Sequence, residues 1–226
     1  MANGSVVFDA RIRTPFTLIC AGQTASGKTT FVINLLLNAE YLLDSSPDYY
    51  VWFYGIESNA TEFLRENEVF ENLTLHKGLP ESFDDFIQPG KKGCFVIDDL
   101  TRESSNSPLV AELFFQKSHH NFVSVILLTQ NLFFEGKERK NLLRNAHNLC
   151  IFSNPLDQSI VYTLANKILP SNQKTFFDIF DAALSEDFGY LLVIGQLRVP
   201  RISRFRTDIF GLTQRVFTPT AWLKKN

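Results

Sequence analysis

The chain has 226 residues, of which 45% are hydrophobic, and a formal net charge of −2. These values suit one domain with a full apolar core, and they argue against a protein that binds nucleic acid over its whole surface. The sequence contains no run of roughly 18 apolar residues, so we expect no membrane span. The charge is polarised, because residues 1–136 carry −8 and residues 137–226 carry +6. We expect a single domain over residues 1–226, with its core at about 14–210.

The first motif along the chain is a glycine-rich loop, Gly22–Thr29, which reads G-x-x-x-x-G-K-T. It follows an apolar run of strand length, Phe16–Ala21, and precedes a buried helix that continues to about Leu43. The glycines let the backbone approach a polyphosphate, and loop N–H groups and the helix dipole bind its charge. Lys28 is expected to reach the β- and γ-phosphates, and the Thr29 hydroxyl to bind Mg²⁺. The predicted nucleotide-binding residues are Gly22, Gln23, Thr24, Ala25, Ser26, Gly27, Lys28, Thr29 and Thr30.

Beyond this loop, apolar strand candidates alternate with helical stretches. The expected strands are Phe16–Ala21, Tyr50–Tyr54, Leu73–His76, Cys94–Asp98, Val123–Thr129, His147–Phe152, Tyr190–Ile194 and Ile202–Thr207. The later helices are expected at Thr61–Phe70, Leu109–Lys117, Lys140–Asn145, Leu156–Ile168 and Gln173–Leu184. This alternation indicates an α/β fold with a mainly parallel central sheet flanked by helices, and ligands then bind at the carboxyl ends of the strands.

The three cysteines, Cys20, Cys94 and Cys150, each lie inside an apolar, strand-like run. Their spacing matches no metal motif, and their number is odd. We therefore expect small core residues in a reducing compartment, and neither a disulfide framework nor a zinc site.

The strand candidate Cys94–Asp98 ends in two carboxylates, Asp98 and Asp99. An NTPase needs an acid at the end of a strand, and we expect this strand to lie beside the P-loop strand. Asp98 is expected to hold Mg²⁺, directly or through water, and Asp99 to activate water against the γ-phosphate. Turns often begin with Asp, so the pair predicts hydrolysis only in combination with the P-loop.

A third polar residue, Gln130, ends the buried strand candidate Val123–Thr129. In a nucleotide-binding sheet, this amide is expected to contact the γ-phosphate or the attacking water. A hydrogen bond that merely closes the end of the strand is the alternative interpretation.

The three motifs Gly22–Thr29, Ile97–Asp99 and Leu128–Gln130 together resemble the FtsK–HerA superfamily of DNA-translocating ATPases. The block Ser118–Phe133 is similar to one branch, the viral genome-packaging ATPases of the poxvirus type found in adintoviruses, Polinton-type elements and virophages. The resemblance covers roughly residues 14–210 and implies a P-loop NTPase fold of the RecA/ASCE-like type, with ATP and Mg²⁺ as cofactors. Many relatives carry Glu where Asp99 stands, which is longer by one methylene.

The resemblance further implies a homo-oligomeric ring, a pentamer or hexamer, that translocates double-stranded DNA into a preformed viral capsid. ATP then binds between subunits, and a neighbour supplies an arginine finger. Arg139 is the first candidate, with Arg144 and Arg102 as alternatives. The expected location is inside an infected host cell or a virion, with nucleus and cytoplasm both open.

A packaging motor must hold the phosphate backbone without reading sequence, and Lys and Arg on exposed loops suffice. The DNA-binding candidates are Lys91, Lys92, Lys117, Arg201 and Arg204. We expect Arg204 and Arg206 to share one face of a strand. A solvated charged face, or contact with the acidic first half of a neighbouring subunit, is the alternative for these arginines.

Two other functions stay open at this point. The first is a P-loop kinase for a small molecule, although the sequence offers no obvious arginine-rich lid. The second is a nucleotide-dependent assembly factor that has lost hydrolysis, against which Lys28, Thr29, Asp98 and Asp99 argue because all four are present.

Overall fold

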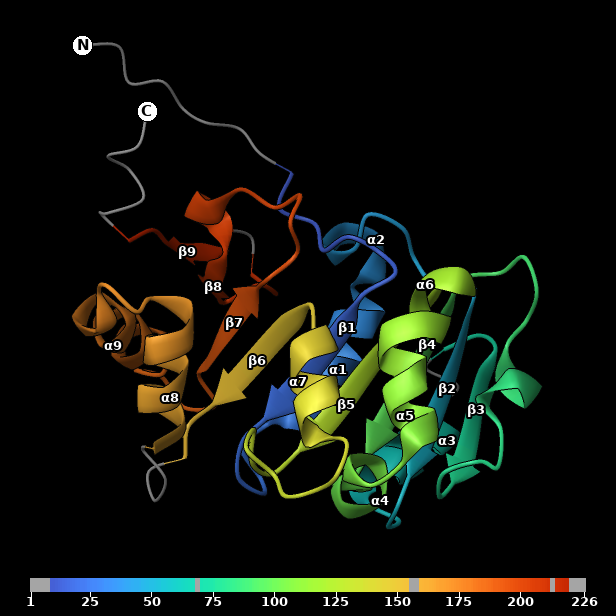
Figure 1. Cartoon of the computed structure of the whole chain (residues 1–226). Helices are drawn as coiled ribbons and strands as arrows, with labels where there is room; N and C mark the ends of the chain where they lie inside the picture. Colours follow the sequence, from blue (N-terminus) through green and yellow to red (C-terminus); the bar gives the residue numbers. More distant parts are fainter. Residues whose placement is uncertain (1–8, 68–69, 155–158, 212–213, 220–226) are drawn as a thin grey trace.

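The computed structural model describes residues 9–67, 70–154, 159–211 and 214–219. In this part of the chain, a nine-stranded sheet of order β3-β2-β4-β5-β1-β6-β7-β8-β9 forms the centre (Figure 1). The strands are β1 Thr17–Ala21, β2 Tyr49–Tyr54, β3 Leu73–Lys77, β4 Gly93–Asp98, β5 Val123–Thr129, β6 Asn148–Phe152, β7 Tyr190–Ile194, β8 Phe205–Thr207 and β9 Arg215–Phe217. The six strands from β3 to β6 in this order are parallel, and β7, β8 and β9 are antiparallel.

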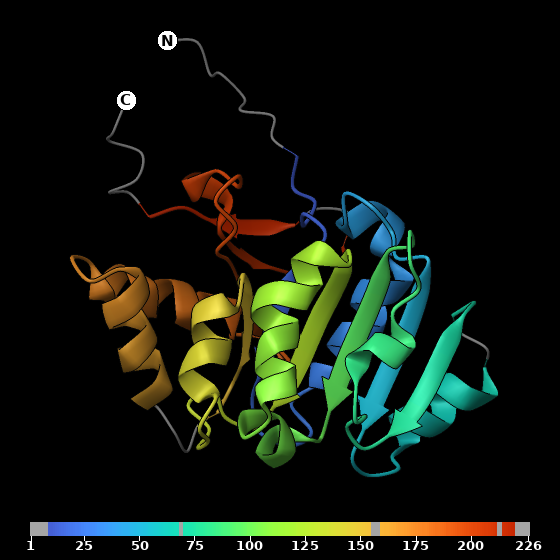
Figure 2. The same ribbon diagram turned by 45° about the vertical axis from the view of Figure 1, so that its right-hand side comes forward.

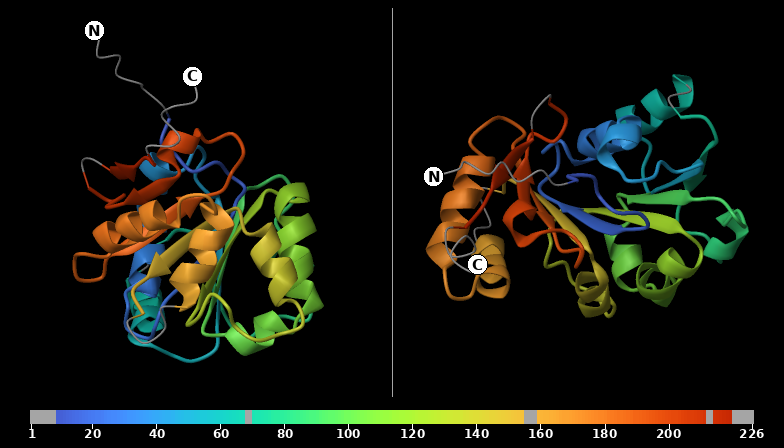
Figure 3. Two further views of the ribbon diagram at one scale, coloured as in Figure 1. Left: turned by 60° about the vertical axis from the view of Figure 1, so that its left-hand side comes forward. Right: turned by 90° about the horizontal axis from the view of Figure 1, so that it is seen from above.

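Two layers of helices enclose the sheet, as the view from above shows (Figure 3). The helices are α1 Lys28–Leu37, α2 Ala39–Leu42, α3 Asn59–Glu66, α4 Thr101–Ser105, α5 Pro108–Glu112, α6 Ser118–His120, α7 Arg139–Asn145, α8 Ser159–Ile168 and α9 Gln173–Ala183. A π-helical turn, Leu113–Lys117, joins α5 to α6. One apolar core contains the buried side chains of α1, α2 and α3, and the other contains those of α5, α7, α8 and α9.

Alternation along the central strands explains why the sheet has two cores. In β1, Leu18 and Cys20 belong to the α1 core, whereas Ile19 and Ala21 belong to the α5 core. All five residues of β1 and all seven of β5 are buried. Strands buried on both faces read as continuous apolar runs, which is why the sequence predicts them well. The predicted fold class is confirmed, and Cys20, Cys94 and Cys150 are buried in the core, as expected.

The order of the strands corrects one expectation. β1 pairs with β5 and β6, and β5 lies between β1 and β4. The prediction that the strand ending in Asp98 lies beside the P-loop strand is therefore wrong. The crossover through α5 and α6, which lie in front of the sheet in Figure 2, returns the chain to the gap between β4 and β1. Apolar runs of similar composition do not reveal which of them become neighbours.

The predicted strand Ile202–Thr207 is also too long. Arg201–Ser203 forms a 3-10 turn, Arg204 keeps helical backbone angles, and β8 begins only at Phe205. Arg204 and Arg206 therefore do not share a strand face. Arg206 is buried, and its guanidinium donates to the carbonyls of Ser203 and Ala10. β9 is not predicted from the sequence, and the predicted start of α8 at Leu156 lies outside the described residues.

Among the helices of the described ranges, none is long and apolar enough to cross a bilayer.

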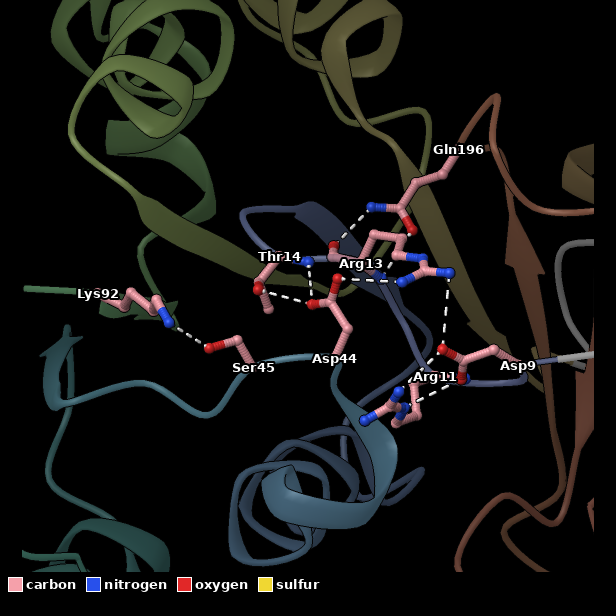
Figure 4. Close-up of polar contacts among 8 residues, drawn as sticks. All are labelled: Asp9, Arg11, Arg13, Thr14, Asp44, Ser45, Lys92 and Gln196. Carbon is pink, nitrogen blue, oxygen red and sulfur yellow. Dashed lines mark hydrogen bonds and ion pairs between the residues drawn. The ribbon is translucent and has the colours of Figure 1, made fainter.

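A polar network ties the segment before β1 to the amino-terminal edge of the sheet (Figure 4). Arg13 N donates to Gln196 Oε1 at 3.1 Å, and Gln196 Nε2 donates to the Arg13 carbonyl at 2.7 Å. Asp44 Oδ1 accepts from both the N–H and the hydroxyl of Thr14 at 2.8 Å. Segments far apart in the chain are thus fastened at one place, opposite the carboxyl ends of the strands.

The paired hydrogen bonds of Gln196 generate a stability prediction. Gln196→Ala removes both partners of the Arg13 backbone, so we expect the free energy of unfolding to fall by about 1–3 kcal/mol. Urea denaturation followed by tryptophan fluorescence measures the change. Gln88→Ala is the control, because Gln88 is exposed and its loss should change the free energy by less than about 0.5 kcal/mol. Equal effects of the two substitutions would contradict the prediction.

Candidate active site

The P-loop turns sharply between β1 and α1. Ala25 and Gly27 have φ values of 63° and 95°, both left-handed, and α1 begins directly afterwards at Lys28. A Cβ at Gly22 would lie 2.6 Å from Cβ of Phe152, so a side chain at this position does not fit. A loop of this kind presents successive N–H groups to one concave side, at the positive end of the α1 dipole. The predicted phosphate-binding residues thus form the expected strand–loop–helix unit.

Lys28 lies against the loop that it follows. Its Nζ donates to the carbonyls of Gly22 and Gln23, each at 2.7 Å. Burial lowers the pKa of Lys28, and the negative charges of Asp98 and Asp99 oppose this shift. The ammonium group is thereby held at the mouth of the loop, where an anion would contact it.

Asp98, at the end of β4, contacts the start of α1. The Thr29 hydroxyl donates to Asp98 Oδ2 at 3.3 Å. Burial raises the pKa of Asp98 to about 6, Asp99 adds to the shift, and the Thr29 hydrogen bond and Lys28 oppose it. A nearby cation would stabilise the ionised form of this buried carboxylate. The hydroxyl and the carboxylate are hard oxygen ligands, so these two residues fit Mg²⁺.

A cavity of about 400 Å³ brings together Lys28, Thr29, Asp98, Asp99 and Gln130. Asp98, Asp99 and Gln130 place it at the carboxyl ends of β4 and β5. These strands end at the lower edge of the sheet in Figure 1. This is the edge at which ligands bind in open α/β sheets. The five predicted catalytic and metal-binding residues outside the arginines are therefore neighbours in space.

Asp99 reaches this cavity through an unusual backbone conformation. Its φ is 54°, in the left-handed region, and its side chain is exposed. A Cβ at Gly55 would lie 2.3 Å from the Asp99 carbonyl oxygen, so the end of β2 leaves room for this turn only because residue 55 is glycine. Strained residues of this kind concentrate at functional sites.

The sequence did not predict the role of a third carboxylate in the same cavity, Glu57. It accepts hydrogen bonds from the Tyr54 hydroxyl at 2.8 Å, from Thr61 Oγ1 at 3.0 Å and from Arg65 Nη2 at 3.1 Å. The hydrogen bond from Tyr54, with those from Thr61 and Arg65, lowers the pKa of Glu57. Its place just after β2 is a weak signal, because polar residues follow most strands.

The candidate arginine fingers lie at different distances from this edge. Arg102 lines a neighbouring cavity of about 740 Å³ together with Asp99 and Gln130. Arg139 begins α7, next to α4, where Glu138 N donates to the Ser105 carbonyl at 2.8 Å. Arg144 lies near the other end of α7, where the chain contacts the start of β1. Arg102 and Arg139 thus lie toward the edge with the cavity and Arg144 lies away from it, and the choice of arginine finger stays a prediction.

The five DNA-binding candidates all lie at the opposite, amino-terminal edge of the sheet. Lys91 and Lys92 precede β4, and Arg201 and Arg204 follow β7, which runs antiparallel. Lys117 is the least available, because its Nζ lies 2.7 Å from Asp84 Oδ2 and 3.8 Å from Glu112 Oε1. Strands of this length separate the two edges by roughly 20 Å.

Comparisons with known proteins identify the fold. A scan of protein-family models found no match, and no curated protein matches the sequence. Among solved structures, the chain is similar to B204, the DNA-packaging ATPase of Sulfolobus turreted icosahedral virus, at a TM-score of 0.54 and 12% identity, covering 92% of this chain and 99% of that one. It is also similar to the genome-packaging NTPase B204 of Sulfolobus turreted icosahedral virus 2 in complex with ATP-gammaS, at a TM-score of 0.52 and 11% identity, covering 90% and 97%.

At these identities the likeness establishes the fold, and it extends over nearly the whole of both chains. The chain is an α/β protein with the fold of P-loop NTPases, in which β5 stands between the P-loop strand and the strand that carries the acid.

The raised pKa of Asp98 generates a second prediction. The pKa of Asp98 is about 6 in the folded protein and its ordinary value is 3.8. Between these values the folded state binds a proton that the unfolded state has lost, so stability falls as the pH rises from 3.8 to 6, and above pH 6 the ionised group destabilises the fold in full. Asp98→Asn should therefore stabilise the metal-free protein at pH 8 by about 2–3 kcal/mol, or roughly 4–10 °C in Tm. The gain should fall to roughly half at pH 5, because the penalty fades as the pH approaches 3.8.

Thermal denaturation in EDTA at the two pH values measures this change. Asp178→Asn, at an exposed position of α9, is the control and should leave Tm nearly unchanged. A Tm for Asp98→Asn at or below the wild-type value at pH 8 would show that the buried charge is not destabilising.

Proposed function

We propose that the chain is an ATP-hydrolysing translocase of double-stranded DNA that packages a viral genome into a preformed capsid, as an FtsK–HerA-type motor. One observation carries the proposal: Lys28, Thr29, Asp98, Asp99 and Gln130, from three separated motifs, line one cavity on a P-loop NTPase sheet. The likeness over nearly the full length to packaging ATPases, one of them in complex with an ATP analogue, supports the same reading.

The residues of the cavity divide the chemistry of hydrolysis among them. The loop N–H groups and Lys28 bind the phosphates and stabilise the charge that develops on the γ-phosphoryl group. Mg²⁺, held by Thr29 and Asp98, supplies further neutralisation of that charge. Asp99 accepts a hydrogen bond from the attacking water, and Gln130 orients it, because both lie at the strand ends that face the P-loop. Glu57 lies at the same cavity, where its charge is paired with Arg65 at 3.1 Å.

In the proposed motor, the site lies between subunits of a ring. Asp99 and Gln130 are exposed, and the neighbouring cavity that they line with Arg102 opens to solvent. Head-to-tail packing suits a chain whose first part carries −8 and whose second part carries +6. Arg139, in the basic part, is the arginine proposed to cross to the neighbour's γ-phosphate.

The DNA contacts of the motor are proposed at Lys91, Lys92, Arg201 and Arg204, with Lys117 less available. These residues lie at the edge of the sheet away from the P-loop, Lys91 and Lys92 before β4 and Arg201 and Arg204 after β7, and none of them belongs to the described lining of the cavity. Contacts of Lys and Arg with phosphates are independent of base sequence and weaken steeply with salt.

The proposed motor should hydrolyse ATP faster with double-stranded DNA, and Lys28→Ala should abolish turnover because the main cation of the phosphate site is lost. Release of phosphate with and without DNA at low salt measures both effects. Lys174→Ala, at an exposed position of α9, is the control. A wild-type protein that transfers phosphate to an added nucleoside, and ignores DNA, would be a kinase and would refute the proposal.

The shared site generates a prediction for mixed rings. Subunits with Arg139→Ala and subunits with Asp99→Ala should each be inactive, and an equal mixture should recover about a quarter of the wild-type rate, since that share of interfaces joins two intact halves. Arg102→Ala mixed with Asp99→Ala should recover nothing if Arg102 serves its own subunit. Absence of recovery with Arg139, Arg144 and Arg102 alike would contradict a site shared between subunits.

A further inference from the structure

A second cavity lies on the other side of the P-loop. It has a volume of about 490 Å³, and the loop and the start of α1 form one wall of it through Ala25, Gly27 and Thr30. Ala25, Lys28 and Thr29 also line the cavity of about 400 Å³ that contains Asp98, Asp99 and Gln130, so the P-loop separates two pockets. A chain of phosphates bound by the loop, with its γ end at Asp99, would have its other end at this second pocket.

Four aromatic rings form the floor of the second pocket. The ring centroid of Phe31, on α1, lies 4.7 Å from that of Tyr190, 5.3 Å from that of Phe210 and 5.9 Å from that of Phe152. These rings come from α1, β6, β7 and the segment after β8, and they meet edge to face. A floor of this kind is apolar and preformed, as small-molecule sites usually are.

Phe188 forms the rim of the pocket, and both its solvent exposure and its backbone conformation are unfavourable for a phenylalanine. Its side chain is 70% exposed, and its φ of 60° is left-handed, which is rare for a bulky residue. A Cβ at Gly27 would lie 3.4 Å from Cδ1 of Phe188, so the ring stands directly beside the P-loop. The following residue, Gly189, packs so tightly on the end of α9 that a Cβ would lie 2.8 Å from the Ala183 carbonyl. The turn therefore fixes an exposed aromatic ring next to the phosphate site.

We propose that this second pocket binds the base of the nucleotide, with the ring of Phe188 stacked on it. The inference rests on the proposed ATPase function and adds the group that selects the nucleotide. A nucleobase is flat and aromatic, so stacking would bury the exposed face of the Phe188 ring. A role in ligand binding also accounts for the strained backbone of Phe188, because strained residues concentrate at functional sites. Stacking does not read hydrogen-bonding groups, so purines bind more tightly than pyrimidines through their larger rings.

Asn34 gives the pocket its hydrogen-bonding selectivity. It lies on α1 beside the floor, and among the described lining residues it has the one side-chain amide. An amide donates and accepts at once, which matches the amino group and ring nitrogen of adenine. Guanine presents two acceptors on the corresponding edge. ATP is therefore preferred over GTP, with stacking on Phe188 as the larger contribution.

The test compares ATP with inorganic tripolyphosphate, which carries the phosphates and no base. In Phe188→Ala, the Kd and KM for Mg-ATP should rise roughly 5- to 150-fold, the range of one lost base–aromatic stack. The rate at saturating ATP and the Kd for tripolyphosphate should stay within about twofold, and Phe188→Trp should restore tight binding. Asn34→Ala should reduce the preference for ATP over GTP with little effect on tripolyphosphate.

Phe122→Ala is the matched control. Phe122 is also left-handed, with a φ of 54°, and 59% exposed, but it lies at the amino-terminal edge, where its carbonyl accepts from Gly93 N. Its loss should leave ATP binding unchanged.

Three outcomes would overturn a proposal, and they are distinguishable. A wild-type protein that binds neither ATP nor tripolyphosphate refutes the ATPase function. Binding of tripolyphosphate with unchanged ATP affinity in Phe188→Ala refutes the base pocket alone. If the Phe188→Ala oligomer dissociates in sedimentation while its ATP affinity is kept, Phe188 belongs to a contact between subunits. This result also refutes the base pocket.

Discussion

The contact between Thr29 and Asp98 is the constraint on which the rest of the site depends. The two residues belong to α1 and β4, and β4 does not touch β1 in the sheet, because β5 lies between them. The hydroxyl reaches the carboxylate only if the three strands end at the same level. The register of β1 with β5, where Ala21 lies opposite Thr129, and of β5 with β4, where Leu127 lies opposite Ile97, provides that level. The sheet thus serves as a frame that aligns the ends of three apolar strands.

The sheet also brings several carboxylates to one cavity, and the folded protein neutralises their negative charge only in part. Asp98, Asp99 and Glu57 line the cavity of about 400 Å³ with Lys28, and burial already raises the pKa of Asp98 to about 6. Lys28 has a pKa lowered by burial and is held by two loop carbonyls. Such a site is costly for stability and suited to a ligand that brings both a cation and phosphates. The destabilisation of the fold and the proposed chemistry therefore have one cause.

Much of this site is predictable because its residues follow apolar strands. Asp98, Asp99 and Gln130 stand immediately after buried runs, and the P-loop has a recognisable spacing. The order of the strands is not predictable in this way, since runs of equal apolarity do not encode their neighbours. The role of Glu57 is not predictable because it depends on β2 lying beside β4. The short length of β8 is not predictable because it depends on the 3-10 turn at Arg201–Ser203. Phe188 stands out only through its backbone angle and exposure, which a sequence of many phenylalanines does not reveal.

Two elements, β4 and α7, connect the proposed ATP edge with the basic edge. β4 runs from Gly93, next to Lys92, to Asp98, and it is hydrogen-bonded on both sides and buried along nearly all of its length. A strand held in this way transmits displacement only together with the whole sheet. α7 lies outside the sheet, touches α4 through the Glu138–Ser105 hydrogen bond at one end, and accepts a hydrogen bond from Thr17 at the other. In the proposed motor, α7 joins the Asp99 side of the site to the start of β1, and it begins with Arg139.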